Sequence, residues 1–384
     1  MPHNCLSQVY DVVILGGGPA GLSTAVALRR LTSLSVAVYE AAPPGTQRIG
    51  ESCPPDILML LSQLGLADAF RSGPHMPFPG FASLWGSPRV GYNDFITSPL
   101  GSGWRLDRPA FDTMLAEAAQ AAGADVCFST RFISATPLPG GGHKLQLKGK
   151  GGDKPVDVTA RYVVDATGAR ARFAASVGIA REQAEELSAY VQFAKVEQGT
   201  LTGRVLLESK PYGWWYCAAL PGNQVVTMLV AEADTVSQLR NDKQGELYRH
   251  ALENTHLVGP SLHELSLSSP HAHTWPVVSG CLPQVQGRDW IAVGDAAASY
   301  DPVPAQGIYK ALSHGIAAAK EMAAIFDDES YTPGQYQTYV YTSYQTYLQH
   351  RHDLYARELR WQDAEFWRNR LARRAEDMVS GSEG

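Results

Sequence analysis

Three glycines close to the N-terminus have the spacing needed to hold a phosphate group. Gly16, Gly18 and Gly21 form a G-x-G-x-x-G pattern directly after the short apolar run 12–15. That run predicts a buried strand, and the Ala- and Leu-rich stretch 22–31 predicts a helix. In such a unit the first glycine allows a tight turn, the second lets a pyrophosphate approach the backbone, and the third lets the helix pack on the strand. The helix N-terminus then offers free N–H groups and a partial positive charge to the phosphates.

An acidic residue at the right distance strengthens this interpretation. A second predicted strand, residues 35–39, ends at Glu40, nineteen residues after Gly21. In dinucleotide-binding units a carboxylate at this place accepts hydrogen bonds from a ribose hydroxyl. Strand, loop, helix, strand and acid occur in the required order, so the sequence predicts a dinucleotide site for either FAD or NAD(P).

Two later segments favour FAD. Residues 161–168 predict a strand that ends in a turn at Gly168, and residues 290–295 predict a buried strand that ends in Gly-Asp. A proline-rich loop, 301–308, and a helical stretch to about residue 326 follow. These segments resemble the FAD-binding set of the glutathione-reductase-type flavoproteins, in the branch of single-component aromatic hydroxylases. The resemblance implies that Asp295 binds the ribityl chain and that residues 302–308 approach the flavin, where a helix N-terminus stabilises negative charge on the reduced ring.

Further strings narrow the resemblance. Gly50-Glu51-Ser52, followed by two prolines, resembles the loop beside the flavin in flavin-dependent halogenases and their relatives. The same resemblance implies that Arg108 lies near the flavin, whereas its spacing alone also permits a helical salt bridge with Asp112. Two departures argue against halogenation. The chain has no lysine before Lys144, and Pro304-Ala305-Gln306 replaces the Glu-Ser-Thr of halogenases.

The closer resemblance is to halogenase-like monooxygenases. These include flavoproteins that hydroxylate a tryptophan side chain of a partner protein during maturation of quinone-cofactor amine oxidases and dehydrogenases. The shared strings span nearly the whole chain: Gly50–Pro55, Ser83–Gly86, Gly103–Arg108, Gly213–Trp215 and Phe366–Arg370. The resemblance implies bound FAD, O₂ as co-substrate, and an aromatic small molecule or a Trp-bearing protein or peptide as substrate. No second G-x-G-x-x-G unit is present, so NAD(P)H would act transiently or a separate flavin reductase would supply electrons.

The expected site residues follow from these motifs. Adjacent tryptophans on a strand point to opposite faces, so only one of Trp214 and Trp215 can face a pocket. No metal site is expected, because His271 and His273 lack further ligands. The expected catalytic residues are Glu51, Trp215 and Pro304, with Trp85, Trp214, His271 and Asp301 as further pocket candidates. The expected cofactor-binding residues are Gly16, Gly18, Pro19, Ala20, Gly21, Glu40, Arg48, Glu51, Ser52, Arg108, Gly168, Asp295, Gln306, Gly307 and Ile308.

The motif order predicts an α/β protein with interleaved domains. A Rossmann-like FAD-binding domain comprises 1–77, 107–186 and 284–330, and an inserted antiparallel-sheet substrate domain comprises 78–106 and 187–283. A helix is predicted over 242–255. Residues 331–384 form a C-terminal helical segment, whose regularly spaced tyrosines indicate packing on the FAD domain or, alternatively, a dock for a protein partner.

Composition excludes several classes of protein. A net charge of −6 argues against nucleic acid or an anionic membrane as the main partner. No apolar run reaches the length of a membrane-spanning helix. Five scattered cysteines predict free thiols and a reducing, cytoplasmic location. The alternatives to an oxygenase are a flavin-dependent halogenase, an FAD-dependent alkene reductase, and a flavin-bearing maturation protein that acts by binding a partner.

Overall fold

A computed structural model describes residues 9–149, 154–268 and 270–371, and the chain forms two compact units. The first unit contains Met1–Gly73, Asp107–Ala184 and Ser279–Gln345, and the second contains Pro74–Leu106, Glu185–Val278 and Thr346–Gly384. This division does not set residues 331–384 apart as a third part. The boundary between the two units instead falls within the helix over residues 335–356, between Gln345 and Thr346.

The first unit is built on a mixed sheet whose strand order is β8–β2–β1–β11–β10–β9, with β18 also paired to β11. Strands β1, β2, β8, β11 and β18 pair in parallel, while β9 and β10 form an antiparallel extension. Residues 12–15 of β1 are almost completely buried, as expected for parallel strands covered on both faces. The strands are β1 Val9–Leu15, β2 Val36–Tyr39, β8 Asp125–Cys127, β9 Thr130–Pro137, β10 His143–Gly149, β11 Val156–Asp165 and β18 Trp290–Ala292.

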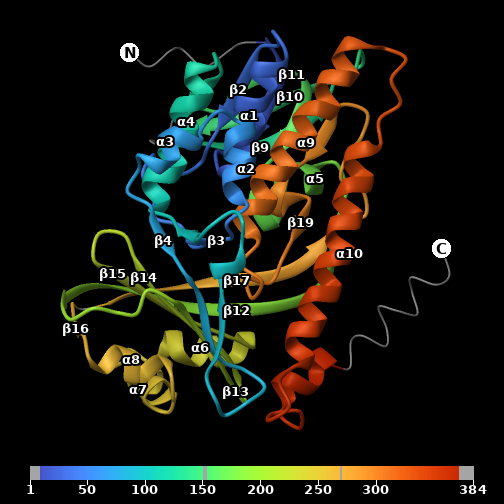
Figure 1. Ribbon diagram of the computed structural model, residues 1–384. Coiled ribbons are helices and arrows are strands. Elements are labelled where there is room, and N and C mark those ends of the chain that lie inside the picture. Colours follow the sequence, from blue (N-terminus) through green and yellow to red (C-terminus); the bar gives the residue numbers. More distant parts are fainter. Residues whose placement is uncertain (1–8, 150–153, 269, 372–384) are drawn as a thin grey trace. The chain divides into compact units, whose positions relative to one another are not determined.

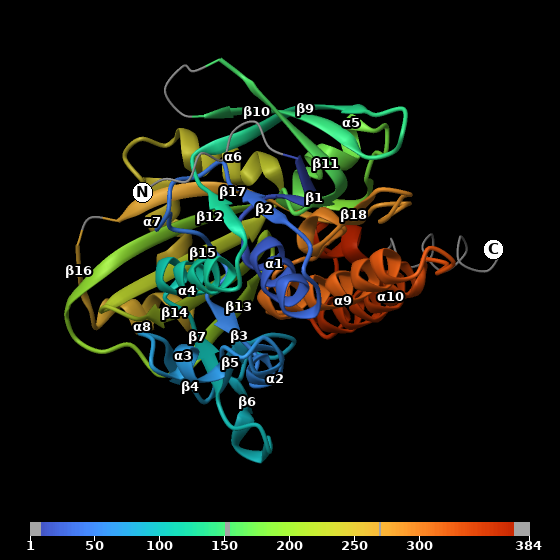
Figure 2. The ribbon, with the colours of Figure 1, turned by 90° about the horizontal axis from the view of Figure 1, so that it is seen from above.

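Two long helices of the first unit, α1 Pro19–Leu31 and α9 Gly307–Asp327, lie side by side (Figures 1 and 2). Their close approach depends on Gly315, because a Cβ atom there would lie 2.1 Å from Ser23 Oγ. Gly21 has a similar role, since its Cβ would lie 2.0 Å from the Gly16 carbonyl oxygen. The remaining helices of this unit are α2 Ile57–Gln63, α3 Ala67–Arg71, α4 Arg108–Ala121 and α5 Arg172–Ser176, with short 3-10 turns η2 Gly168–Arg170 and η3 Gly294–Ala296.

The second unit is built on a large sheet in which β17, β12, β15, β14, β13, β5 and β6 are successive neighbours. The pairing of β13 with β5 is parallel, and the pairs β12–β15, β15–β14, β14–β13 and β5–β6 are antiparallel. Together with the first unit, this sheet confirms the predicted α/β fold class. The strands are β5 Gly80–Leu84, β6 Gly91–Asp94, β12 Glu182–Gln198, β13 Val205–Lys210, β14 Gly213–Leu220, β15 Gln224–Ala231 and β17 His271–Cys281. Shorter elements of the second unit are the strands β4 Met76–Phe78, β7 Gly103–Arg105 and β16 Ser266–Leu267 and the 3-10 turn η1 Phe95–Thr97, whereas the short strands β3 Ser52–Cys53 and β19 Ala298–Ser299 belong to the residue ranges of the first unit.

Three short helices pack on this sheet: α6 Ala233–Asn241, α7 Glu246–Glu253 and α8 Val258–His263. The predicted helix over 242–255 is wrong in its start. Asp242 lies between α6 and α7, and its carboxylate accepts the Leu247 N–H at 2.7 Å. An aspartate that bonds a nearby backbone N–H interrupts a helix and favours the start of the next one.

The C-terminal region is helical, with α10 over Gln335–Ala356 and a further helical stretch over 365–371. Of the regularly spaced tyrosines, Tyr336, Tyr344, Tyr347 and Tyr355 are buried and serve packing, whereas Tyr339 is exposed. Among the helices of the described ranges, none has the length and hydropathy needed to cross a bilayer.

The cysteines differ in part from the expectation of free thiols. Cys53 and Cys217 are free, whereas Cys127 is disulfide-bonded.

Candidate cofactor-binding and active site

The glycine-rich loop leaves the start of α1 open to a ligand. The loop connects the buried strand β1 to α1, and Gly16 adopts φ +113°, which a residue with a side chain rarely does. Gly18 is the N-cap residue, no side chain caps the helix, and its first turn has no acidic residue. Free N–H groups and the partial positive charge of the helix therefore favour an anion here. The predicted strand, loop and helix are all present at Gly16, Gly18, Pro19, Ala20 and Gly21.

Glu40 is a buried carboxylate that organises this loop. Its Oε2 accepts the Gly17 N–H at 2.7 Å and its Oε1 accepts the Ala42 N–H at 2.7 Å. Arg48 Nη2 lies 3.1 Å from Oε1, so the acid is also paired with a cation. The sequence predicts a carboxylate for a ribose hydroxyl. The structure adds that Glu40 fixes the backbone of the phosphate loop at the same time.

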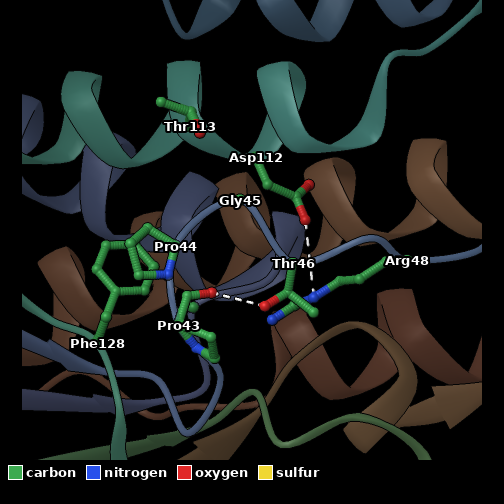
Figure 3. Close-up of a pocket in the computed structure, with 9 residues that line it drawn as sticks. Pro43, Pro44, Gly45, Thr46, Arg48, Asp112, Thr113 and Phe128 are labelled. Carbon is green, nitrogen blue, oxygen red and sulfur yellow. Dashed lines mark hydrogen bonds and ion pairs between the residues drawn. The ribbon is translucent and has the colours of Figure 1, made fainter.

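A small pocket lies beside the same loop (Figure 3). Arg48 and Asp112 form a 3.8 Å ion pair at its edge, and Pro44 and Phe128 supply apolar surface. A Cβ atom on Gly18 would lie 3.0 Å from Arg48 Nη1, which places this cation close to the N-terminus of α1. An anionic group at the helix start would therefore meet both the helix N–H groups and a guanidinium. The lining residues are Gly17, Pro43, Pro44, Gly45, Thr46, Arg48, Asp112, Thr113 and Phe128.

The Gly-Glu-Ser loop is held by Arg108, the first residue of α4. Its guanidinium is buried and donates to the carbonyl oxygens of Ile49 and Gly50, and it also lies 3.3 Å from the Asp112 carboxylate. Arg108 thus forms the helical salt bridge with Asp112 that its spacing permits, and it also fixes the backbone of the predicted flavin loop. Ile308 Cδ1 lies 4.0 Å from the Cβ position of Gly50, so the start of α9 adjoins this loop.

Glu51 is the unusual titrating group of the loop. Its side chain is buried, its Oε2 accepts the Gly50 N–H, and its Oε1 has no hydrogen-bond partner among the described residues. Burial raises the pKa of Glu51 to about 7, and the neighbouring Arg108 charge limits the rise. Near neutral pH this carboxyl can therefore either hold or release a proton. The adjacent Ser52 is buried as well.

The Gly-Asp motif forms a tight turn after β18. Gly294 adopts φ +58°, and η3 begins there, next to η2 with Gly168 at φ +71°. The Asp295 side chain is half exposed, and its Oδ1 lies 2.6 Å from Lys310 Nζ. Asp295 is therefore both accessible to a ligand and fixed by a cation.

The proline-rich loop leads into α9. Asp301 is buried and its carboxylate accepts the Val303 N–H at 2.9 Å, and the Ala305 N–H donates to the Pro302 carbonyl oxygen. Ala305 adopts φ +53°, a strained conformation for alanine, of the kind that clusters at ligand sites. Pro304 and Gln306 are half-buried. Helix α9 then begins at Gly307 without a side-chain cap or an acid in its first turn, which makes it a second open helix N-terminus.

The residues of the first unit fit a dinucleotide flavin. Helices α1 and α9 both present uncapped N-termini, the loop at Gly18 has no side chain, and Asp295 and Glu51 offer carboxyl oxygens that no described residue occupies. Such a set suits a pyrophosphate, a polyol chain and an electron-accepting ring. Sequence reasoning missed Lys310 and Arg181, which fix the Gly-Asp turn. Lys310 lies three residues after Gly307, and only its burial identifies it.

The aromatic candidates belong to the second unit, where strand β14 sends its two tryptophans to opposite faces. Trp215 is fully buried in the core formed with α6, α7 and α8, and its ring contacts Tyr248 at 5.2 Å between centroids. This position differs from the predicted catalytic role, because strand alternation points Trp215 toward the packing helices. His271 is exposed on β17.

Trp214 lies in what we call the aromatic cluster, which consists of Trp85, Trp214, Tyr355, Phe366 and Trp367. Its members donate to the protein itself: Trp214 Nε1 to Tyr355 Oη, Trp85 Nε1 to the Leu354 carbonyl oxygen, and Trp367 Nε1 to the Lys210 carbonyl oxygen. The strings around Trp85, Trp214 and Trp367 that supported the subgroup resemblance therefore meet in one packed core.

The fold and the site define an FAD-dependent enzyme. The profile of the family described as "FAD binding domain" matches residues 9–340, and the chain belongs to this family. It is an FAD-dependent oxidoreductase.

Several known proteins are similar to this chain. It is 28% identical to the "Putative FAD-dependent oxidoreductase LodB" of Marinomonas mediterranea, over 95% of this chain and 98% of that protein. Among solved structures, the flavin-dependent halogenase CmlS superposes with a TM-score of 0.82 at 22% identity, covering 98% of this chain and 71% of CmlS. The peptidyl tryptophan dihydroxylase QhpG superposes with a TM-score of 0.75 at 23% identity, covering 94% of this chain and 78% of QhpG.

Proposed function

We propose that this protein is an FAD-dependent monooxygenase that hydroxylates an electron-rich, indole-like aromatic. The substrate that we propose is a tryptophan side chain of a partner protein or peptide, modified during maturation of a quinone cofactor. The LodB relative, named a putative FAD-dependent oxidoreductase, matches nearly end to end and supports the flavin chemistry. The substrate is suggested by the likeness to QhpG, a peptidyl tryptophan dihydroxylase described as essential for tryptophylquinone cofactor biogenesis.

The observation that carries this proposal is the loop before α9. Halogenases of the group have Glu-Ser-Thr there, and this chain has Pro304, Ala305 and Gln306. Pro304 carries no ionisable group, and Ala305 carries no hydroxyl group for a halide. The chain also has no lysine before Lys144 to handle hypohalous acid. These replacements favour oxygen transfer over halogenation.

We assign the following roles to the residues of the first unit. When bound, FAD supplies the redox and O₂ chemistry, which is the cofactor's own. The N-terminus of α1 and Arg48 bind the pyrophosphate, Glu40 fixes the loop and accepts from the ribose, and Asp295 accepts from the polyol hydroxyls. Gln306, Gly307 and Ile308 present the α9 N-terminus to the ring.

Glu51 is the residue that we propose for proton handling. Its pKa of about 7 lets it hold a proton below neutral pH and release it above. Its Oε1 is buried and forms no hydrogen bond with a described residue, so its hydrogen-bonding capacity is unused within the protein. Ser52 and Arg108 keep this loop in place.

The mass of the product tests the reaction class. Purified protein is incubated with a Trp-containing peptide of a candidate partner, NADPH or a flavin reductase, O₂ and bromide, and the peptide is analysed by mass spectrometry. A gain of one or two oxygen atoms is the expected result. A bromine isotope pattern would contradict the monooxygenase, and reduction of a substrate without O₂ would favour the alkene reductase.

The alternative of a flavin-bearing partner protein needs a different test. It is motivated by relatives whose names include a carrier protein or a peptidyl substrate. Asp295→Ala is expected to abolish FAD binding and leave the partner unmodified. Persisting modification of the partner together with normal complex formation would instead support a role in binding and presentation.

A further inference from the structure

Lys310 is a cation in a position where both burial and the helix dipole disfavour a positive charge. Its side chain is 3% exposed, and it lies in the first turns of α9, where the partial positive charge of the helix opposes a cation. Its Nζ donates to Asp295 Oδ1 at 2.6 Å and to the Ala298 carbonyl oxygen, and it lies 4.0 Å from the centroid of the Tyr300 ring. Burial lowers the pKa of Lys310, while the Asp295 charge limits the fall.

A charge in this position is not needed for packing. A buried ion pair contributes little net stability, and an apolar side chain of similar volume often replaces it without loss. The partner of Lys310 is moreover half exposed, so water can solvate Asp295 in the absence of the lysine. Stability therefore does not explain why a Lys310–Asp295 ion pair is present at this place.

The geometry of the Gly-Asp turn supplies that reason. Arg181 donates to the carbonyl oxygens of Asp295 at 2.6 Å and Ala296 at 2.8 Å, which fixes the turn backbone. Lys310 fixes the side chain by binding one carboxylate oxygen, Oδ1. The other oxygen, Oδ2, has no hydrogen-bond partner among the described residues, so it is left for a ligand hydroxyl.

We propose that Lys310 is a positioning residue that holds the Asp295 carboxylate in the orientation needed to accept hydrogen bonds from a polyol chain. This inference rests on the proposed cofactor-binding role of Asp295. Lys310 does not touch the ligand; it removes the rotational freedom of the carboxylate before the ligand binds, which lowers the entropic cost of binding.

The test compares the affinities of two ligands for the full-length chain stripped of flavin. FAD contains the polyol chain, whereas ADP probes only the glycine-loop half of the site. Lys310→Met is expected to weaken FAD binding at least about tenfold, the size of one lost charge-assisted hydrogen bond, and to leave ADP binding unchanged. Lys310→Arg, which keeps the charge, is expected to bind FAD more tightly than Lys310→Met. Lys320→Met is the matched control, because Lys320 is exposed on the same helix.

Each result supports or overturns the proposal. Equal losses of FAD and ADP affinity in Lys310→Met would make Lys310 a structural residue and overturn the proposal, as would equal FAD affinities of the Arg and Met variants. If Lys310→Met does not fold, Lys310→Gln serves instead, with the same expected selectivity for FAD over ADP. Asp295→Ala distinguishes the proposed role of Asp295 from that of Lys310. Normal FAD affinity in that variant would refute the role of Asp295 itself, whereas lost affinity there with normal affinity in Lys310→Met would refute the Lys310 inference alone.

Discussion

Two regions of this molecule contain distinctive sequence strings, but they differ in whether their polar groups have hydrogen-bond partners within the protein. Around Gly18, Glu51 and Gly307 in the first unit, helix N-termini lack side-chain caps and a buried carboxylate oxygen lacks a partner among the described residues. In the aromatic cluster of the second unit, the indole N–H groups of Trp85, Trp214 and Trp367 all donate to the protein itself. The unpartnered Glu51 oxygen suits a ligand site, whereas the partnered indole N–H groups of the aromatic cluster suit a packed core.

A substitution in the aromatic cluster should lower the stability of the fold. Trp214→Ala removes a fully buried ring together with the hydrogen bond that its Nε1 donates to the Tyr355 hydroxyl. We expect a loss of about 3–5 kcal/mol in the free energy of unfolding, measured by urea denaturation. Trp361→Ala, at a half-buried tryptophan of the same C-terminal region, is the control and should cost much less. Wild-type stability in Trp214→Ala would mean that the cluster is a pocket and not a core.

A substitution in the Gly-Glu-Ser loop should instead change the stability in a pH-dependent way. Burial favours the protonated form of Glu51, so its contribution to stability is complete below about pH 4.5 and is lost as the pH rises to about 7. A shift of this size corresponds to about 3 kcal/mol at most. Glu51→Gln is therefore expected to match the wild type near pH 4.5 and to exceed its thermal stability at pH 8, both measured without FAD. The same stability difference at both pH values would contradict the raised pKa.

The glycine loop offers a comparison within one motif. A Cβ at Gly18 would meet only the end of the flexible Arg48 side chain, whereas a Cβ at Gly21 would lie 2.0 Å from a backbone oxygen. Gly18→Ala should therefore fold normally but bind FAD and ADP about tenfold more weakly, because the backbone can no longer approach the pyrophosphate. Gly21→Ala should lose stability as well. Titration of both ligands checks the first expectation and thermal melting the second; unchanged ligand affinity in Gly18→Ala would place the phosphates elsewhere.

The smallest effect is expected at Trp215. Because its ring packs with Tyr248 in the core, Trp215→Phe should cost about 1–2 kcal/mol of stability through lost volume. We expect kcat and KM for the aromatic substrate to remain within about twofold of the wild type, a change of less than about 0.5 kcal/mol. A large fall in kcat without a fall in stability would restore Trp215 to the catalytic residues.

The sequence alone determined the parts of the protein that depend on local order. The G-x-G-x-x-G loop, Glu40 and the Gly-Asp turn each sit between elements that are adjacent in the chain, so spacing and residue type suffice to predict them. The α/β class follows from the same alternation. The loop at Pro304–Gln306 likewise needed no structure to argue against halogenation.

Only the tertiary structure decided what depends on contacts between distant residues. Lys310 is an ordinary helical lysine in the sequence, and it becomes notable because packing buries it against Asp295. The adjacent Trp214 and Trp215 cannot be told apart in the sequence. Trp214 packs in the aromatic cluster and Trp215 packs in the core beneath α6–α8, because helices distant in the chain cover the sheet face to which Trp215 points. Burial, which sets both the raised pKa of Glu51 and the cost of the Lys310 charge, is a property of the folded chain and of no local string.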